Sequence, residues 1–243
     1  MTETHGALMD QVYRRQRLFY DATRKFYLLG RDFTLRQLNP GTGAHILEIA
    51  CGTGRNLQQI DMRYPGRHLY GLDISSEMLR SARAKLGEQA KLAQGDACDF
   101  DPLDLFGRAK FDCIVMSYCI SMIPHWPSAI QEAVNHLAPG GELHIVDFGD
   151  QSRMPRWFDR SLRGWLARFH VIPRDDLHRT LNGRQEAQVT HKQLLRSYVQ
   201  YACVRKGDLA DQPETKFEPI GETKASHMSP MQNTESECPA VSS

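Results

Sequence analysis

Three acidic residues stand where the edge of a sheet could bring them together. Glu48 lies near the end of the apolar run 45–50, Asp73 ends a second such run, and Asp96 lies in the segment 94–97, which ends the third expected strand. Open α/β sheets bind ligands at the carboxyl ends of their strands, where a carboxylate can accept hydrogen bonds from both hydroxyls of a ribose. We expect this role for Asp73, with Asp96 facing an adenine amino group. Glu48 suits a ligand that carries a positive charge.

A glycine turn joins the first apolar run to a helix. The turn reads Ala50-Cys51-Gly52-Thr53-Gly54, and its glycines permit tight turning and close approach of the backbone to a ligand. In dinucleotide-binding loops a third glycine follows at the position that Leu57 holds here, and no acid precedes the turn. The pattern therefore indicates a nucleoside ligand other than a dinucleotide.

Strand-like and helix-like segments alternate between residues 44 and 148. The apolar runs lie at 45–50, 68–73, 111–116 and 142–147. This rhythm predicts a parallel sheet covered on both faces. Ser75 or Ser76 is a candidate helix N-cap, and Pro127 is expected to open a helix that stops at Pro139. A closing strand is expected over 198–204.

Composition excludes several classes of protein. With 30 Lys and Arg against 29 Asp and Glu, the formal charge is +1, so nothing indicates a nucleic-acid partner. The chain shows no secretory leader and no long apolar run, which predicts a cytoplasmic protein. Its six cysteines form no C-x-x-C pair, so we expect neither a metal site nor a disulfide framework. Residues 207–243 are acidic and poor in apolar residues, which predicts a disordered tail.

The segments Glu48–Gly54, Gly71–Ser75, Gly95–Ala97 and Leu137–Gly141 resemble the motifs of the class I S-adenosylmethionine-dependent methyltransferases. The resemblance implies a Rossmann-like, doubly wound, mostly parallel seven-stranded sheet with helices on both faces, within a methyltransferase domain at 41–206 that follows an N-terminal helical cap at 1–40. It also implies S-adenosylmethionine as cofactor, with the glycine turn at its methionyl part. The expected cofactor-binding residues are Glu48, Ala50, Gly52, Gly54, Asp73, Ile74, Asp96, Ala97 and Ser117.

The segment from Ser117 to Trp126 should line the space between cofactor and substrate. Methyl transfer from a sulfonium is an in-line displacement that needs orientation, exclusion of water and an unprotonated nucleophile. His125 is a candidate base, although a packing role is the commoner one for a lone histidine. Tyr118 and Trp126 could flank a forming ammonium through cation–π contacts, or they could be core aromatics.

An Arg-rich amphipathic segment at 153–174 is expected to form a helix or lid. Phe158, Leu162, Trp165 and Phe169 fall on one stripe, and Arg156, Arg160 and Arg163 fall opposite. The segment fits either an ordinary core-facing helix or an interfacial helix beside anionic lipid. Tyr13, Tyr20 and Tyr27 recur at seven-residue spacing among basic residues near the N-terminus. We expect binding to an anionic membrane surface at the inner face of the cell membrane.

A narrower resemblance is to the bacterial diacylglyceryl-homoserine N-methyltransferases, which form a betaine lipid. It spans about residues 8–206 and rests on the segments 20–24, 27–32, 117–126, 146–151 and 169–174. It implies trimethylation of a glycerolipid amine, with the synthase of the homoserine lipid as a candidate partner. It makes Tyr20, Tyr27, Arg31, Tyr118 and Asp147 candidates for the substrate side, and Tyr20 and Tyr118 are our choices for an aromatic lining.

Three other functions fit the same sequence. A phosphatidylethanolamine N-methyltransferase would use similar chemistry on another amine. A quinone C-methyltransferase would share the cofactor half but should need a defined base. A membrane-bound protein that binds the cofactor without turnover is the alternative outside enzymes.

Overall fold

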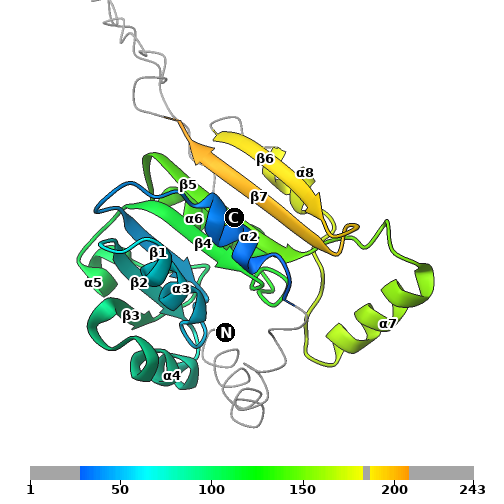
Figure 1. Cartoon of the computed structure of the whole chain (residues 1–243), viewed down its shortest axis with the longest axis horizontal. Helices are drawn as coiled ribbons and strands as arrows, with labels where there is room; N and C mark the ends of the chain where they lie inside the picture. Colours follow the sequence, from blue (N-terminus) through cyan, green and yellow to red (C-terminus); the bar gives the residue numbers. More distant parts are fainter. Residues whose placement is uncertain (1–27, 183–186, 208–243) are drawn as a thin grey trace, which may run out of the picture. The chain divides into compact units, whose positions relative to one another are not determined.

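The computed structural model describes residues 28–182 and 187–207, and within them one seven-stranded sheet (Figure 1). Its strand order is β3-β2-β1-β4-β5-β7-β6, with β1 to β5 parallel and β7 antiparallel to both neighbours. The strands are β1 (His45–Ile49), β2 (His68–Asp73), β3 (Ala90–Gln94), β4 (Phe111–Ser117), β5 (Leu137–Phe148), β6 (Ala187–Leu194) and β7 (Val199–Lys206). The predicted Rossmann-like fold is confirmed.

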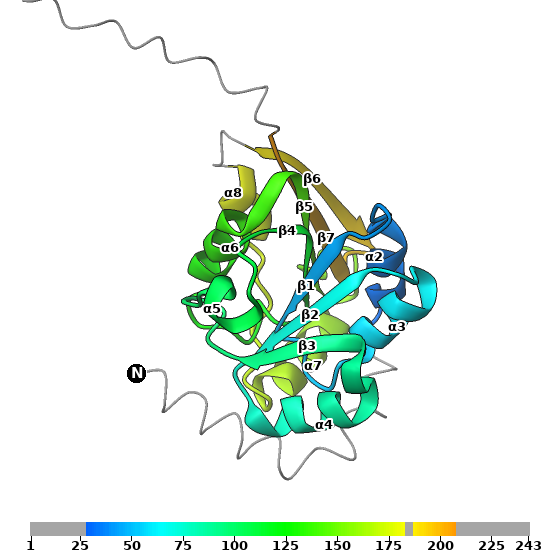
Figure 2. The ribbon, with the colours of Figure 1, turned by 90° about the vertical axis from the view of Figure 1, so that its left-hand side faces the viewer.

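Helices cover both faces of this sheet (Figure 2). The helices on one face are α2 (Arg31–Gln37), α3 (Arg55–Arg63) and α4 (Ser76–Leu86), and those on the other are α5 (Pro102–Phe106), α6 (Trp126–Asn135) and α8 (Leu177–Asn182). Helix α7 (Arg156–Ala167) follows β5, and a short 3-10 turn at Gly87–Gln89 follows α4. Because the central strands are buried on both faces, their sequences are continuous apolar runs and do not alternate between apolar and polar residues.

Local signals explain where several elements begin. The Ser75 side chain accepts a hydrogen bond from the Met78 amide at 3.3 Å, so Ser75 is the N-cap of α4, one of the two predicted candidates. The Asp101 side chain caps α5 in the same way, by accepting from the Leu103 amide at 2.8 Å. These caps set the residues at which α4 and α5 begin after β2 and β3.

Two predicted boundaries are wrong. Helix α6 ends at Asn135, and Pro139, Gly140 and Gly141 lie inside β5 rather than ending a helix. A register shift between Phe111 and Cys113 of the neighbouring strand accommodates this Pro-Gly-Gly segment. The amphipathic segment at 153–174 contains a helix only from Arg156 to Ala167, so Phe169 lies beyond the helix end.

Some predictions fall on residues that the structure does not describe. Tyr20, Tyr27 and the tail after residue 207 lie outside the described residues, as does most of the predicted N-terminal cap. The part of that cap within the described residues includes α2, which packs on α3 and on β5. Among the described helices, none has the length and apolar character needed to cross a bilayer.

Candidate active site

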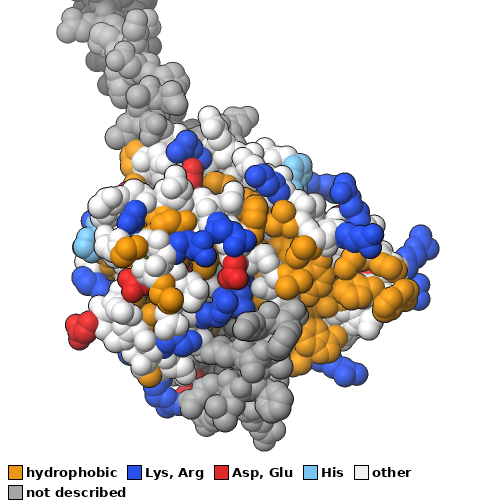
Figure 3. Space-filling view, in the orientation of Figure 1, with side chains coloured by type: hydrophobic (Ala, Val, Ile, Leu, Met, Phe, Trp, Pro, Cys, Tyr) orange, Lys and Arg blue, Asp and Glu red, His pale blue; other side chains and the backbone are white. Residues whose placement is uncertain are grey.

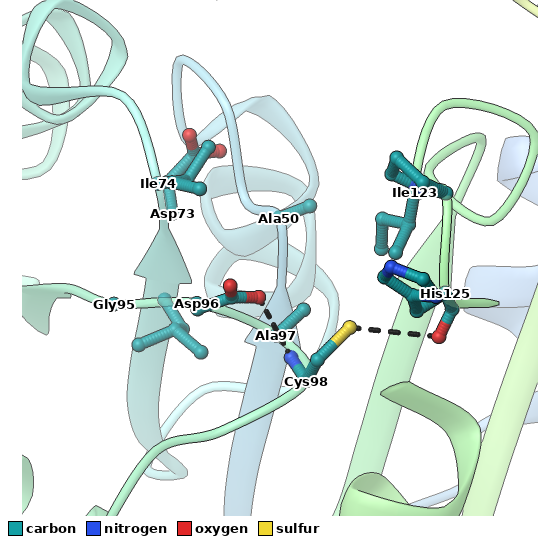
Figure 4. Close-up of a pocket in the computed structure, with 11 residues that line it drawn as sticks. Ala50, Asp73, Ile74, Gly95, Asp96, Ala97, Cys98, Ile123 and His125 are labelled. Carbon is teal, nitrogen blue, oxygen red and sulfur yellow. Dashed lines mark hydrogen bonds between the residues drawn. The ribbon is translucent and has the colours of Figure 1, made fainter. Parts of the chain in front are cut away.

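A cavity of about 370 Å³ opens at the carboxyl ends of the parallel strands (Figure 4). Asp73 and Ile74 reach it from the end of β2, Ala50 from the turn after β1, and Ile123 and His125 from the facing loop. Its lining residues are Ala50, Leu72, Asp73, Ile74, Gly95, Asp96, Ala97, Cys98, Ile123, Pro124 and His125. Five of the nine predicted cofactor-binding residues therefore lie together here.

The Asp73 carboxylate is fixed by backbone amides. Oδ2 accepts from the Gly52 amide at 2.7 Å and Oδ1 from the Ser75 amide at 2.9 Å. Asp73 is 7% exposed and borders the cavity. Each carboxylate oxygen has two lone pairs, so the same group that holds the glycine turn can also accept from a sugar hydroxyl.

The segment after β3 forms the part of the cavity wall between Asp73 and the facing loop (Figure 4). Asp96 Oδ1 accepts from the Cys98 amide at 2.9 Å, and the Cys98 thiol donates to the His125 carbonyl at 3.5 Å (Figure 4). This second contact joins the wall to the N-cap residue of α6. Ile123 and Pro124 belong to the segment that the sequence predicted to line this space, whereas Cys98 was not predicted as a cavity residue, because a cysteine in a loop behaves as a small apolar residue without a chemical signal of its own.

The turn between β1 and α3 has a left-handed backbone. Ala50, Gly52 and Gly54 have φ of 56°, 55° and 74°. A Cβ on Gly54 would lie 2.7 Å from Leu86 Cδ1 and 3.2 Å from Ala82 Cβ, so both conformation and space require glycine there. The absence of a side chain at Gly54 thus lets α4 pack directly against the start of α3.

Glu48 is a buried carboxyl beside this turn. It is 1% exposed, and its Oε1 accepts from Asn56 Nδ2 at 2.7 Å. Burial raises the pKa of Glu48 to about 8, although the Asn56 bond and the positive charge of Arg31 act in the opposite direction. Oε2 is buried and has no hydrogen-bond partner among the described residues. An unsatisfied buried oxygen next to a glycine turn suits a ligand that brings a cationic donor.

The loop from Ser117 to Trp126 is held by two residues of the predicted motifs. Asp147 Oδ2 accepts from the Ser121 amide at 3.1 Å and its Oδ1 from the Phe148 amide at 2.7 Å. The Arg174 guanidinium donates to the carbonyls of Ile120 and Ile123 at 3.1 and 3.0 Å. Arg174 was not predicted as a site residue, although it lies in a segment on which the narrower resemblance rests.

Three predicted substrate-side residues are placed differently from the expectation. Tyr118 is 3% exposed, donates its hydroxyl to the Leu29 carbonyl and packs edge-on against Phe148 at 4.9 Å. Trp126 is 5% exposed within the main core cluster. Both are core aromatics, and neither lines the cavity. Asp147 is fully buried and serves the loop, so the structure gives it a positioning role rather than a contact with substrate.

Burial also shifts the pKa values of these buried groups. It raises the pKa of Asp147 to about 6, against the bonds from Phe148 and Ser121, and raises that of Tyr118 well above its ordinary value. The Ser117 hydroxyl, at the end of β4, is a buried group without a hydrogen-bond partner among the described residues. Arg31 is 8% exposed and lies close enough to Glu48 and Tyr118 to influence the pKa of both.

The three predicted α7 arginines are not equivalent. Arg156 and Arg160 are exposed. Arg163 instead donates to Asp159 at 2.7 Å, to Asp175 at 3.1 Å and to the Asp150 carbonyl at 3.2 Å. Its role in the structure is to attach α7 to the segments before and after it, so the expectation of a free lipid-facing charge at Arg163 is corrected.

Comparison with known proteins identifies the cofactor-binding half. Residues 46–141 match the family model described as "Methyltransferase domain". Curated relatives include the demethylmenaquinone methyltransferase of Listeria welshimeri, 26% identical over 167 residues that cover 65% of this chain and 69% of the relative. An O-methyltransferase of Penicillium expansum is 32% identical over 123 residues, which cover 49% of this chain and 43% of that protein.

Solved structures share the fold at low sequence identity. The plantazolicin methyltransferase BpumL, solved with S-adenosylhomocysteine, matches with a TM-score of 0.62 at 17% identity over 85% of this chain and 97% of its own. The phosphoethanolamine N-methyltransferase 2 of Haemonchus contortus matches with a TM-score of 0.58 at 16% identity, over 73% of this chain and 52% of its own. The family match, the fold and the geometry agree, and S-adenosylmethionine is confirmed as the cofactor.

Proposed function

We propose that this chain, a class I S-adenosylmethionine-dependent methyltransferase, methylates the amine of diacylglyceryl-homoserine three times to form diacylglyceryl-trimethylhomoserine. The bound cofactor supplies the methyl group from its sulfonium. The residues of the chain then have three tasks, which are to hold the two reactants in line, to exclude water and to keep the amine unprotonated. The Glu48 carboxyl, Asp73 and the glycine turn are suited to the first task on the cofactor side.

One observation carries the proposal. The segments 117–126, 146–151 and 169–174, on which the homoserine-lipid resemblance rests, form one hydrogen-bonded unit. Besides the bond that the Asp147 carboxylate accepts and those that Arg174 donates, the Ile172 amide donates to the Ser121 carbonyl at 2.8 Å, and Gln200 donates to the carbonyls of Phe148 and Arg174 at 2.8 and 2.9 Å. Ile123, Pro124 and His125 of this unit line the cavity. The likeness therefore concerns the walls of the site as well as its cofactor turn, which supports a similar substrate.

The chemistry of the amine fits an enclosed site. A primary amine has a pKa near that of Lys, about 10.4, so each transfer must be preceded by loss of a proton. Partial removal from water lowers that pKa by disfavouring the charged form. His125, which lines the cavity, is the candidate acceptor of the proton among the described residues.

The test is an assay of the purified full chain with S-adenosylmethionine and diacylglyceryl-homoserine dispersed in detergent, read by mass spectrometry. We expect successive gains of one, two and three methyl groups. Phosphatidylethanolamine and demethylmenaquinol serve as parallel substrates. No methylation of the homoserine lipid, with robust turnover of either parallel substrate, would overturn the proposal in favour of that substrate.

A second candidate is methylation of a quinol ring carbon, which the similarity to the Listeria demethylmenaquinone methyltransferase favours. Carbon methylation requires that a ring hydroxyl lose its proton in the reacting state, so a positioned base should matter more than it does for an amine. Under this alternative, His125→Asn should lower quinol turnover about 100-fold or more. Under the amine proposal the same variant should keep turnover of the homoserine lipid at high pH, where the amine is deprotonated by the solvent.

A further inference from the structure

We propose that α7, Leu28–Leu29 and the turn between β6 and β7 form a single docking surface for an anionic lipid bilayer. The inference rests on the proposed function for the choice of partner, because a lipid substrate has to be reached in its membrane. Its location is argued from separate observations on α7, on the turn between β6 and β7, and on a cavity that is lined by Leu28–Leu29 and by Leu195 of this turn.

Helix α7 is the first segment. Of its twelve residues only Leu166 is fully buried, and the Trp157 side chain is 72% exposed. Phe158, Leu162 and Trp165 are half-buried against a cluster that contains Leu28, Tyr198 and Val199. In Figure 3 a broad hydrophobic area extends over α7, with Lys and Arg side chains at its border. A tryptophan exposed to this degree suits the boundary between water and lipid, where an amphipathic ring is stable.

The turn between β6 and β7 is the second segment. Leu195, Arg196 and Ser197 have φ of 50°, 56° and 65°, a left-handed conformation that costs energy for residues other than glycine. Hydrogen bonds hold the turn in place, since the Ser197 carbonyl accepts from the Gln151 amide at 2.9 Å and the Tyr198 carbonyl from the Gly149 amide at 2.9 Å. The strained turn presents Leu195, 55% exposed, and the exposed Arg196. Strain held by several bonds is typical of functional segments.

A second cavity joins these segments. It has a volume of about 450 Å³, with Leu28, Leu29, Leu194 and Leu195 on its apolar wall and Arg31, Arg36 and Arg55 among its polar lining. Leu28 and Leu194 also belong to the cluster on which α7 packs. The cluster on which α7 packs therefore shares Leu28 and Leu194 with a cavity that is lined by three arginines, of which Arg55 lies 3.7 Å from Asp32.

Charge selects an anionic bilayer as the partner. Arg153, Arg156, Arg160 and Arg168 are exposed on or beside α7. The acids nearby, Asp159 and Asp175, are engaged by Arg163 and do not offset the exposed arginines. A helix with a half-buried apolar face and an exposed tryptophan, bordered by arginines, has the composition of an interfacial helix. Anionic lipids attract each such charge within about a Debye length of the surface.

The experiment is sedimentation of the full chain with vesicles of phosphatidylcholine alone and of phosphatidylcholine mixed with phosphatidylglycerol. We expect binding to the mixed vesicles that weakens as salt is raised. Trp157→Ser/Leu195→Ser should weaken binding at both low and high salt. Arg156→Glu/Arg160→Glu should weaken it at least tenfold at low salt.

A matched control changes an exposed apolar residue and an exposed arginine elsewhere. Met62, 72% exposed, and Arg63 lie at the end of α3, so Met62→Ser/Arg63→Glu should sediment as the unchanged protein does. Retained affinity for S-adenosylmethionine by calorimetry shows that each variant is folded. Equal sedimentation of all proteins would contradict the proposed docking surface. So would α7 variants that bind vesicles normally but no longer self-associate, because the surface would then bind a second copy of the chain. Vesicle binding without methylation of any lipid in detergent would instead remove the proposed function and leave the docking surface standing.

Discussion

Single residues at the site have both a structural and a chemical task, and Asp73 shows this most clearly. Asp73→Ala removes a charged acceptor from the amides of Gly52 and Ser75 as well as from the ribose. Hydrogen bonds to a charged group contribute about 1.5–3 kcal/mol each. We expect at least tenfold weaker binding of S-adenosylmethionine by calorimetry and a lower melting temperature.

Asp96→Ala is the comparison for this variant, because among the described residues the Asp96 carboxylate accepts from one backbone amide, that of the half-buried Cys98. It should weaken cofactor binding with a smaller loss of stability. Unchanged cofactor affinity in a folded Asp73→Ala protein would show that the ribose lies elsewhere.

The burial of Glu48 makes stability depend on pH. The folded protein has a pKa of about 8 at this carboxyl, whereas the ordinary value is 4.5. Its protonated form therefore stabilises the fold fully below pH 4.5, and this contribution is lost as the pH rises to about 8. Glu48→Gln cannot ionise, so the free energy of unfolding of the wild type should fall relative to that of the variant by at most about 1.4 kcal/mol per pH unit.

Urea unfolding of both proteins between pH 5 and pH 9 checks this dependence. The stability difference should change across the range and become constant above pH 8. A difference that stays the same at every pH would mean that Glu48 is ionised throughout.

Among the elements, the turn before α3 is the one that most strictly requires glycine, at Gly54. Gly54→Ala combines a left-handed φ with a Cβ only 2.7 Å from Leu86, whereas Gly66 has a similar φ of 79° and open space around it. Gly66→Ala should cost about 1–2 kcal/mol from conformation alone. Gly54→Ala should cost at least about 1 kcal/mol more, by overpacking against α4, and should weaken cofactor binding. Denaturant unfolding and calorimetry measure both effects, and equal costs would contradict the packing argument.

The loop that walls the cavity depends on Arg174. Arg174→Ala removes the donors to the Ile120 and Ile123 carbonyls, which lie 3.1 and 3.0 Å from the guanidinium. Displacing a positioning element by about 1 Å can cost on the order of 100-fold in turnover, so we expect kcat/KM for the accepted lipid to fall about 10- to 100-fold. Arg174→Lys should retain part of the activity, and the exposed Arg179→Ala should retain all of it. Normal kcat/KM in Arg174→Ala would mean that the loop holds its shape without this residue.

Some elements could be predicted from the sequence because one physical pattern determined them. The central strands are continuous apolar runs, and the Ser75 cap is a local hydrogen bond, so both are visible without the fold. Strand β6 was missed because five of its eight residues are polar and none of them is fully buried, so it lacks the apolar run of the central strands. The roles of Tyr118 and Trp126 depend on tertiary packing, since an aromatic residue in a site loop and one in the core have the same local pattern. Asn56 and Arg174 were missed because their partners are distant in sequence or are backbone carbonyls.

The whole molecule depends on its last two strands. Strand β7 lies between β5 and β6, and its residues pair with Glu142 through Phe148 of β5. A chain that ends after Asn182 lacks both strands and exposes the β5 edge, whose last six residues are fully buried in the complete sheet. We expect this truncated chain to aggregate, because an exposed apolar edge strand is a template for pairing between molecules.

Deletion of residues 211–243 alone is the control, because it leaves every described strand in place. Its melting temperature should differ from that of the full chain by no more than a few degrees, as expected of a segment whose composition offers no core. A truncated chain ending after Asn182 that stays monodisperse in light scattering would contradict the requirement for the closing strands.

The position of β7 also constrains how the protein is made. A ribosome releases β1 to β5 and their helices before β7, so the growing chain passes through a stage in which five parallel strands exist and the β5 edge has no partner. The sheet closes only when residue 206 has left the exit tunnel, and β6 must wait for β7 although it is synthesised first. Chain segments synthesised after residue 206 therefore give the sheet time to close while the nascent chain is still tethered, at about 5–20 residues per second.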